Sequence, residues 1–400
     1  MDTQQTPVSA AGRKQGQASQ ARSADGIEPF TIYVSPFVIE DLRERLGRAR
    51  WPDEIAGAGW QYGANKEYLQ HLCDHWGHGF DWKEQEAQLN QLHHYRTTID
   101  GLGVHFIHER GSGDGIPILL LHGYPDSFVR FLRLIPLLTE PGRGRQRFDV
   151  VIPSMPGYGF SDRPTKPGMN TTRIAALYTQ LMERLGYDRY FVHGGDWGSS
   201  IAEQLAIAHP DRIMGIHLTD VPYQHLFSTP QDQLTDAERA WMKAGQQWQQ
   251  QEGAYVMVQG TKPDTLAFAV NDSPVGLAAW IIEKFYSWTD HSGDLEKVYT
   301  RDELLTNLTI YWVTQTAGSA FRLYFEAMRN PGTPAKGRLE TPTAVLQGPK
   351  DLAPAPRSAA ERAFRVVQWE QLPHGGHFLA MEQPQRLADD LFRFAASVGR

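Results

Sequence analysis

Short runs of apolar residues recur through the middle of the chain, and they predict the strands of a buried sheet. An unbroken apolar run suits a parallel strand that is covered on both faces, whereas alternation suits a hairpin with one solvent-facing side. The predicted strands are residues 97–109, with a turn at Asp100-Gly101, then 116–121, 148–153, the strand that begins at Arg189, and 213–218. An amphipathic helix is predicted over residues 171–185. This succession predicts an α/β fold built on a mostly parallel, doubly wound sheet.

The segment before this sheet pattern has a different texture. Residues 1–26 are rich in Gln, Ser, Ala and Gly and hold almost no large apolar side chains, so they predict a disordered polar tail. Residues 27–94 predict an N-terminal extension with two helices, one capped by Ser35 ahead of Pro36 and one over residues 64–77. The extension holds more aromatic residues than two small helices need, so we expect them to fasten it to the main body.

A long helical block interrupts the sheet pattern. Residues 224–336 are helical and aromatic, with an apolar helix that starts at Ser273-Pro274. The elements that follow the block are the short strands 343–347 and 366–368 and a closing helix over 382–397. The main body therefore divides into a first core part, residues 95–223, and a second core part, residues 337–400. A helical block inserted into a sheet domain is best interpreted as a lid over a ligand site.

Composition and charge narrow the class of protein. At 400 residues, with 41% apolar and 11% aromatic side chains, the chain can bury a large core and form more than one domain. Its 39 basic and 46 acidic residues give a net charge of −7 without a basic run, which argues against a nucleic-acid partner. Cys73 is the single cysteine, and the sequence carries neither a long apolar stretch nor a secretory signal. We therefore expect no membrane anchor and a cytoplasmic location, while a homodimer stays open.

The strongest candidate for chemistry is the stretch Gly-Gly-Asp-Trp-Gly at residues 194–198. It joins an apolar strand to a helix predicted over residues 199–208, and its glycines allow a strained turn that lifts one side chain above the sheet. This pattern matches the nucleophile elbow of the α/β-hydrolase fold, here with a carboxylate. A serine would favour acyl transfer, whereas Asp196 suits attack on a saturated electrophilic carbon, which leaves an alkyl ester on the enzyme. The alternative that Asp196 is only a turn or N-cap acid stays open.

Two further residues stand where an aspartyl nucleophile needs support. Hydrolysis of an ester needs a base that activates water, and His377 follows the last predicted strand in a loop that can reach the elbow. His374 competes with it, but His377 is preferred because it directly precedes the apolar Phe378. Such a base needs an acid that sets its tautomer, and Asp351 follows the strand at 343–347. Taken singly, each also fits a structural role, Asp351 as a turn acid and His377 as a cap.

Backbone N–H groups should face the oxygen on which charge develops while water attacks. Trp197, next to the nucleophile, can supply one, and Tyr124, in the His-Gly-Tyr-Pro loop after the strand at 116–121, can supply the other. His122 can brace this loop, and we keep it out of the chemical step, as we do His193. The two histidines near the C-terminus lack a third ligand at metal-binding spacing, so we expect no metal and no organic cofactor.

Several short motifs are specific enough to carry a resemblance to a known family. They are the elbow itself, Phe80-Asp81-Trp82-Lys83, His105-Phe106-Ile107-His108, Thr261-Lys262-Pro263-Asp264-Thr265, Asn271-Asp272-Ser273-Pro274-Val275-Gly276-Leu277 and Gly375-Gly376-His377-Phe378. Together they make the chain, from residue 27 to its C-terminus, resemble the microsomal-type epoxide hydrolases of the α/β-hydrolase fold. The N-terminal extension is similar to the extra domain of this family, which soluble-type epoxide hydrolases and haloalkane dehalogenases lack.

The resemblance implies a role for each candidate residue. It makes Asp196 the nucleophile, His377 the base that activates water, and Asp351 the orienting acid, a position at which the family uses Glu or Asp. It also implies two lid tyrosines that donate to the epoxide oxygen, and these match Tyr255 and Tyr324. A phenol suits this task because it stays protonated near neutral pH. The membrane anchor of some family members does not carry over, because this chain begins with a polar tail.

The expected function is hydrolysis of a small-molecule epoxide to a vicinal diol through a covalent aspartyl ester. Aromatic residues of the predicted lid indicate a lipophilic or aromatic epoxide, and they include Trp241, Trp248, Trp280 and Trp288. Two alternatives stay open. One is a haloalkane dehalogenase, which would use ring N–H donors for a leaving halide, and the other is a non-catalytic ligand-binding relative on the same fold. The sequence leaves the physiological epoxide and its regio- and stereochemistry undetermined.

Overall fold

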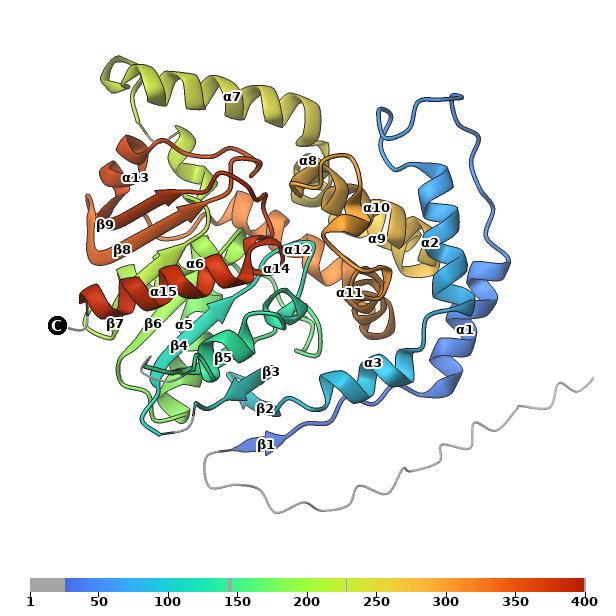
Figure 1. Cartoon of the computed structure of the whole chain (residues 1–400), viewed down its shortest axis with the longest axis horizontal. Coiled ribbons are helices and arrows are strands. Elements are labelled where there is room, and N and C mark those ends of the chain that lie inside the picture. Colours follow the sequence, from blue (N-terminus) through green and yellow to red (C-terminus); the bar gives the residue numbers. More distant parts are fainter. Residues whose placement is uncertain (1–25, 112, 143–145, 228, 399–400) are drawn as a thin grey trace, which may run out of the picture.

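The computed structural model describes residues 26–398 except 112, 143–145 and 228. Apart from Gly26, the polar tail predicted over residues 1–26 lies outside the described residues. One twisted sheet runs through the described part of the chain, with helices on both of its faces and a separate group of helices to one side (Figure 1). The predicted α/β architecture is confirmed.

Within the described residues the sheet has nine strands, in the spatial order β1-β2-β3-β5-β4-β6-β7-β8-β9. The strands are β1 (Ile27–Pro29), β2 (His94–Ile99), β3 (Leu102–Glu109), β4 (Ile116–Leu121), β5 (Phe148–Pro153), β6 (Tyr190–Gly194), β7 (Ile213–Leu218), β8 (Leu339–Gln347) and β9 (Phe364–Gln371). The neighbouring pairs β1–β2, β2–β3 and β3–β5 are antiparallel. The remaining neighbouring pairs, from β5 and β4 through to β8 and β9, are parallel. Because β4 lies between β5 and β6, the strand order reverses there, and ligands of such sheets bind beyond the carboxyl ends of the strands.

Two helix layers cover the parallel strands on opposite faces (Figure 1). On one face, α5 (Thr171–Arg184) packs against α6 (Trp197–Ala208), which also packs on β4, β6 and β7. On the other, α4 (Ile135–Thr139) packs on β5, and α15 (Pro384–Val398) packs on β7 and β8. Because the central strands are covered twice, β4 is an unbroken apolar run in which Ile118 is fully buried.

The N-terminal extension adds three helices and the edge strand β1. α1 (Pro36–Gly47) and α2 (Lys66–His78) lie where the sequence predicts helices, whereas the sequence patterns predict neither β1 nor α3 (Trp82–Leu89). Ser35 occupies the N-cap position of α1, but its side chain makes no capping hydrogen bond. The predicted cap is therefore wrong in this detail, although the helix begins at the expected proline, whose fixed φ suits a first helical position.

Aromatic side chains fasten this extension to the helical block that follows β7. The ring of Trp60 stacks on that of Tyr286 with centroids 4.0 Å apart, and Nε1 of Trp76 donates to Oγ1 of Thr309 at 2.9 Å. The expectation that aromatic residues hold the extension in place is met by these contacts.

The block between β7 and β8 is helical, as expected. Its α-helices are α7 (Asp236–Glu252), α8 (Ala254–Thr261), α9 (Pro263–Asp272), α10 (Pro274–Trp288), α11 (Arg301–Thr314) and α12 (Ala317–Arg329). The closing elements after it are β8, α13 (Arg357–Ala363), β9, α14 (Leu379–Glu382) and α15. Both returning strands are longer than predicted, and the helix predicted from residue 382 begins at Pro384 because a separate short helix ends first. The division of the chain into domains stays a prediction.

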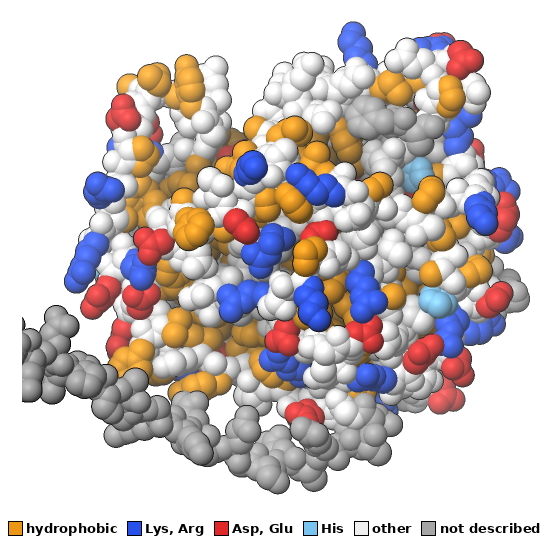
Figure 2. Space-filling model, turned by 180° about the vertical axis from the view of Figure 1, so that it is seen from behind, with side chains coloured by type: hydrophobic (Ala, Val, Ile, Leu, Met, Phe, Trp, Pro, Cys, Tyr) orange, Lys and Arg blue, Asp and Glu red, His pale blue; other side chains and the backbone are white. Residues whose placement is uncertain are grey.

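The described residues show neither a membrane-spanning helix nor a metal-binding cluster. No single helix among these residues has both the length and the apolar character of a membrane span. α9 and α10 have both only when taken together, and they bend by 116° at their junction. The same residues contain no group of three or more His, Cys, Asp or Glu side chains arranged to hold a metal ion. On the face in Figure 2, apolar side chains alternate with lysines and arginines.

Candidate active site

The turn between β6 and α6 lifts Asp196 above the carboxyl edge of the sheet. Asp196 has φ 58° and ψ −126°, a strained conformation that a non-glycine residue keeps only when its surroundings enforce it. A Cβ at Gly194 or Gly198 would overlap backbone atoms of neighbouring segments, so the turn needs glycine at both positions. α6 begins at Trp197, two residues before the predicted start at Ser199. Asp196 is its N-cap residue, but the carboxylate makes no capping hydrogen bond, so the interpretation as a cap acid is wrong.

One histidine and two carboxylates meet beyond this edge. Nδ1 of His377 lies 2.7 Å from Oδ1 of Asp351, and its Nε2 lies 3.5 Å from Oδ2 of Asp196. The side chains of His377, Asp351 and Asp196 are 3%, 5% and 11% exposed, so water screens their charges poorly. The side chain of His374 is 80% exposed, and its nearest ionic partner is Asp290 at 3.9 Å. The structure thus brings the three preferred residues together and leaves His374 outside.

The pKa values of this cluster depend on one another. Burial alone lowers the pKa of His377, but the charges and hydrogen bonds of Asp351 and Asp196 raise it to about 10. Burial likewise raises the pKa of Asp196, and contacts with His377 and with backbone N–H groups outweigh it, so this pKa lies below its ordinary value. At neutral pH an imidazolium at His377 therefore faces an ionised Asp196.

Two backbone N–H groups converge on the carboxyl group of Asp196. The N–H of Tyr124 donates to its Oδ1 at 2.9 Å, and the N–H of Trp197 also helps to lower its pKa. These are the two donors that the sequence places beside the developing charge. Oδ1 accepts the N–H of Tyr124, and Oδ2 is the oxygen that lies near Nε2 of His377.

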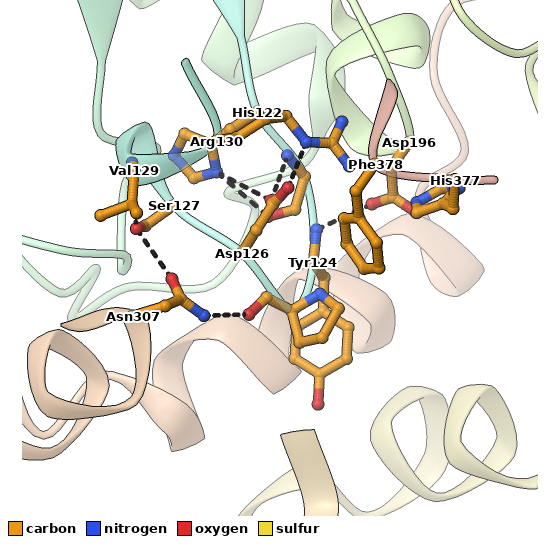
Figure 3. A network of polar contacts seen from close by, with 12 residues as sticks. His122, Tyr124, Asp126, Ser127, Val129, Arg130, Asp196, Asn307, His377 and Phe378 are labelled. Carbon is orange, nitrogen blue, oxygen red and sulfur yellow. Dashed lines mark hydrogen bonds and ion pairs between the residues drawn. The ribbon is translucent and has the colours of Figure 1, made fainter. Parts of the chain in front are cut away.

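A buried polar network holds the loop that carries Tyr124 (Figure 3). Oδ1 of Asp126 accepts the N–H of Gly123 at 3.0 Å, and the other oxygen of this carboxylate pairs with Arg130. Nδ2 of Asn307, in α11, donates at 2.9 Å to the carbonyl oxygen of the proline that follows Tyr124. The lid therefore helps to set the position of this backbone donor.

Two buried histidines, His122 and His193, lie near the site outside the His377 cluster. Nε2 of His122 accepts the N–H of Met155 at 3.1 Å, which is the bracing role expected of it. Burial lowers the pKa of His122, and it lowers the pKa of His193 well below the ordinary value. Both imidazoles are therefore neutral. Nδ1 of His193 lies 3.1 Å from Nδ1 of His217. Their contacts are structural, which agrees with leaving both out of the chemical step.

Glu382 fixes the loop around His377. Its carboxylate accepts backbone N–H groups on both sides of the histidine, from Gly376 and from Phe378 at 2.8 Å each. The N–H of His377 itself donates to the carbonyl oxygen of Trp288 at 2.8 Å. Contacts from α14 and from the end of α10 therefore both fix the backbone of His377, and this limits the movement of its imidazole ring.

Two tyrosines of the lid face the cluster. Tyr255 in α8 and Tyr324 in α12 are 4% and 5% exposed, with ring centroids 5.8 Å apart. The ring of Tyr324 also packs against those of Tyr124 and Trp197, with centroids at 5.5 and 4.8 Å. Burial, reinforced by nearby charge, raises the pKa of both lid phenols well above the ordinary value. Both hydroxyls are therefore protonated and able to donate a hydrogen bond near neutral pH.

A cavity of about 850 Å³ joins the sheet edge to the lid. The predicted side chains that line it are Asp196, Trp197, Trp241, Trp248, Tyr255, Tyr324, Asp351 and His377. Trp280 and Trp288, the other two lid tryptophans taken to indicate a lipophilic substrate, do not line it. Nε1 of Trp280 donates to Gln259 at 3.0 Å, and Trp288 packs beside the cluster, with its ring 5.3 Å from that of His377. Pockets of several hundred Å³ with aromatic walls are typical of small-molecule sites.

The sequence patterns miss three polar residues at this site: Asp220, Glu382 and Asn307. Asp220 lines the cavity and stands two residues after the end of β7, so the rule that selects Asp351 after a strand could also have found it. Glu382 stands five residues after His377, beyond the end of the Gly-Gly-His-Phe motif, and no sequence rule says that its carboxylate folds back onto that loop. Asn307 meets the Tyr124 loop across 182 residues of sequence, and no local pattern signals such a contact.

Comparison with known proteins defines the class first. A family model described as the alpha/beta hydrolase fold matches residues 116–384, more than half of the chain. A second model, described as the epoxide hydrolase N terminus, matches residues 27–131. The cavity beyond the sheet edge lies within the first of these units, and its residues come from both the core and the lid. The protein is a hydrolase of the α/β-hydrolase fold.

The relatives define the family. A protein of Stigmatella aurantiaca is 41% identical over 92% of this chain and 84% of its own length. "Epoxide hydrolase 1" of Oryctolagus cuniculus is 34% identical, covering 94% of this chain and 90% of that protein. The crystal structure of juvenile hormone epoxide hydrolase from the silkworm Bombyx mori has a TM-score of 0.83 and 33% identity, covering 93% of this chain and 94% of that one. The chain belongs to the epoxide hydrolases, and its resemblance to the microsomal type is confirmed.

Proposed function

We propose that this epoxide hydrolase converts a lipophilic or aromatic epoxide to a vicinal diol through a covalent aspartyl alkyl ester. The observation that carries the proposal is that one cavity is lined by a carboxylate on a strained elbow, two phenols, and a histidine paired with a second carboxylate. The proposed steps use only side chains, backbone N–H groups and water, with no metal or organic cofactor.

In the first step, Oδ2 of Asp196 attacks a carbon of the epoxide ring. A carbon–oxygen bond forms to the carboxylate while the ring carbon–oxygen bond breaks, and negative charge moves to the former ring oxygen. Tyr255 and Tyr324 donate hydrogen bonds to this oxygen, which takes a proton from one phenol, and solvent later replaces that proton. Both phenols line the same cavity as the nucleophile, which is the place such donors need.

In the second step, water attacks the carbonyl carbon of the ester. Esterification removes the negative charge of Asp196, which is one of the two charges that raise the pKa of His377, so the imidazolium loses its proton more easily. The neutral ring, oriented by Asp351, then takes a proton from the attacking water. The N–H groups of Tyr124 and Trp197 receive the oxyanion. Collapse breaks the bond from the carbonyl carbon to the former Oδ2, which takes a proton from the imidazolium of His377 and leaves as a hydroxyl of the diol.

The cavity supports a lipophilic substrate of moderate to large size. Its 850 Å³ lies toward the upper end of the usual range of about 300–1,000 Å³, and Trp241 and Trp248 line it at the lid. Relatives of this chain from Ctenocephalides felis and Bombyx mori are named juvenile hormone epoxide hydrolases. Juvenile hormone is therefore a suitable test substrate beside small aryl epoxides such as styrene oxide.

One observation favours a second activity, the release of halide from a haloalkane. Nε1 of Trp197 is buried and forms no hydrogen bond within the described part of the chain, and Trp197 lines the cavity beside Asp196. A ring N–H in this place can receive a leaving halide. The two lid phenols favour the epoxide instead, because the opened ring oxygen needs a proton whereas a halide does not.

Assays of the purified chain with styrene oxide and with a haloalkane of similar size separate these activities. We expect the vicinal diol from the epoxide and no halide from the haloalkane. Halide release without diol formation would transfer the assignment to a dehalogenase, and binding of both compounds without turnover would favour the non-catalytic alternative. A cytoplasmic location and a homodimer stay predictions.

A further inference from the structure

A third carboxylate lies at this site, and the proposed reaction does not use it. Asp220 follows the last residue of β7 by two positions and lines the cavity. β7 runs parallel to β6, with Leu218 opposite Gly194. Because the two strands end side by side, the chain after β7 emerges next to the elbow that carries Asp196.

One oxygen of Asp220 binds the elbow at two points. The N–H of Asp196 donates to Oδ1 of Asp220 at 2.7 Å, and the hydroxyl of Ser199 donates to the same oxygen at 2.8 Å. The N–H of Asp196 lies between the end of β6 and the start of α6, so it belongs to neither regular hydrogen-bond pattern and needs a partner of another kind. Asp220 supplies that partner.

We propose that Asp220 is a positioning residue for the nucleophile. By holding the N–H of Asp196 and the hydroxyl of Ser199 on one oxygen, it keeps the strained turn in the conformation that aims the Asp196 carboxylate into the cavity. A residue at positive φ relaxes when the contacts that enforce it are removed, and a small displacement of a nucleophile slows its reaction strongly. The inference rests on the proposed role of Asp196.

The surroundings of Asp220 give this role a measurable signature. Asp196 faces it from the elbow, Asp351 from the loop after β8, and His377 from the loop before α14. The guanidinium of Arg130, in the 3-10 helix Phe128–Phe131, lies beside Gly195, as does Oδ1 of Asp220. Burial and the negative charges of the two neighbouring aspartates raise the pKa of Asp220 to about 7, against the opposing charge of the imidazolium. A carboxyl oxygen accepts hydrogen bonds in both protonation states, so the anchor persists through this titration.

Ionisation of Asp220 changes the rate of the first step, and its direction follows from charge. An ionised Asp220 repels the anion of Asp196, and esterification of Asp196 relieves this repulsion. The rate of alkylation in the native protein is therefore expected to rise as the pH passes through about 7. Asparagine at this position keeps the accepting oxygen but cannot ionise, so the rise should vanish.

The test compares Asp220→Ala, Asp220→Asn and Ser199→Ala in the full chain, with styrene oxide as the probe. Rapid quenching and protein mass spectrometry give the rate at which alkyl-enzyme forms in a single turnover. Asp220→Ala should slow alkylation by about 10- to 100-fold, Asp220→Asn by no more than about threefold at pH 6, and Ser199→Ala by an intermediate factor. Asp162→Ala is the matched control, because Asp162 also accepts a backbone N–H, from Gly103 at 2.7 Å, but lies outside the cavity lining.

Two results would overturn the role of Asp220. One is a folded Asp220→Ala protein, judged by circular dichroism and its melting temperature, that alkylates at the native rate. The other is an Asp220→Asn protein whose alkylation rate keeps the native rise near pH 7, a test that holds even if the alanine variant does not fold. If instead the native protein forms diol without any alkyl-enzyme, the proposed covalent mechanism is wrong, and this result is distinct from the two that would refute the role of Asp220.

Discussion

The two walls of the cavity hold their reactive groups by different physical means. We define the sheet wall as Asp196, Asp351 and His377. Its side chains are fixed by ion pairs, such as the 2.7 Å contact between His377 and Asp351, and by hydrogen bonds from backbone N–H groups. On the lid wall, defined as Tyr255 and Tyr324, two neutral rings are held by packing, with centroids 5.8 Å apart. One wall presents charge and the other presents hydrogen-bond donors.

This difference predicts which substitutions should reduce the activity most. In the proposed reaction, each member of the sheet wall takes part in a different bond-making or bond-breaking event, so no neighbour can replace it. The two phenols would donate to the same oxygen, so either could partly compensate for loss of the other. Losses on the sheet wall should therefore stop a step, and single losses on the lid wall should only slow one.

The largest effect is expected from Asp196→Ala. Without the carboxylate no ester can form, and diol formation from styrene oxide should fall by at least about 10⁴-fold. Asp264→Ala is the control, because Asp264 is an exposed lid carboxylate that pairs with Arg322 and should leave the rate near the native value. A folded Asp196→Ala protein with substantial activity would contradict the proposed chemistry of the sheet wall.

His377→Gln should be nearly as severe, but for the second step only. The ester still forms, whereas water loses its base, so steady-state turnover should fall by about 10³-fold. The intact protein should gain the mass of one epoxide. His374→Gln is the matched control in the same loop, since this exposed side chain should give neither adduct nor loss. An adduct in the control and none in His377→Gln would exchange the two assignments.

The lid wall should give smaller losses. Tyr255→Phe and Tyr324→Phe keep the rings and remove one donor each, so kcat/KM for styrene oxide should fall by about 10- to 100-fold in each. The double variant should lose more than either. Tyr223→Phe, which removes a hydroxyl from another tyrosine of the same cavity, should change little. If all three single variants lose equally, packing rather than proton donation accounts for the effect.

Asn307 links the walls, and its loss should be milder still. Asn307→Asp keeps an oxygen that accepts from Ser127 but removes the donor to the Tyr124 loop, so hydrolysis of the ester should slow by about tenfold. The rate of ester formation should change less. A variant that slows ester formation alone would show that this contact serves the lid wall and not the N–H pair.

The smallest change concerns stability against pH. His377 has a pKa of about 10 in the folded chain against about 6.5 when unfolded, so its contribution is complete below pH about 6.5 and is lost as the pH rises through about 10. The free energy of unfolding by urea should therefore decrease from pH 7 to pH 10, and less so in Asp351→Asn. A stability that increases over this interval in the native protein would refute the raised pKa.

The sheet wall could be predicted from sequence because its residues follow strands in short motifs. Parallel strands end at one edge of a sheet, so the sequence predicts that Asp196, Asp351 and His377 lie close together there. Asp220 obeys the same rule, and it escaped selection because it stands in no motif with glycines or histidine beside it. The start of α6 was misplaced by two residues, since a strained elbow allows the helix to begin directly after Asp196.

The lid wall could not be predicted from pattern alone. Tyr324 stands among other aromatic residues in α12, and Tyr255 is the single aromatic residue of α8. A tyrosine that packs in a core and one that donates a proton look the same in such sequences. Only the family resemblance selected these two among 15 tyrosines. The contact from Asn307 to the Tyr124 loop depends on how α11 crosses the sheet edge, which is a property of the assembled fold.

A single turnover in water enriched in heavy oxygen tests the central claim most directly. With enzyme in excess over styrene oxide, the account predicts that the label enters the carboxyl group of Asp196, found by mass spectrometry of the peptide that contains it. The diol should carry none, because its new oxygen comes from the protein. Label in the diol and none in Asp196 would mean that water opens the ring directly and that no ester forms.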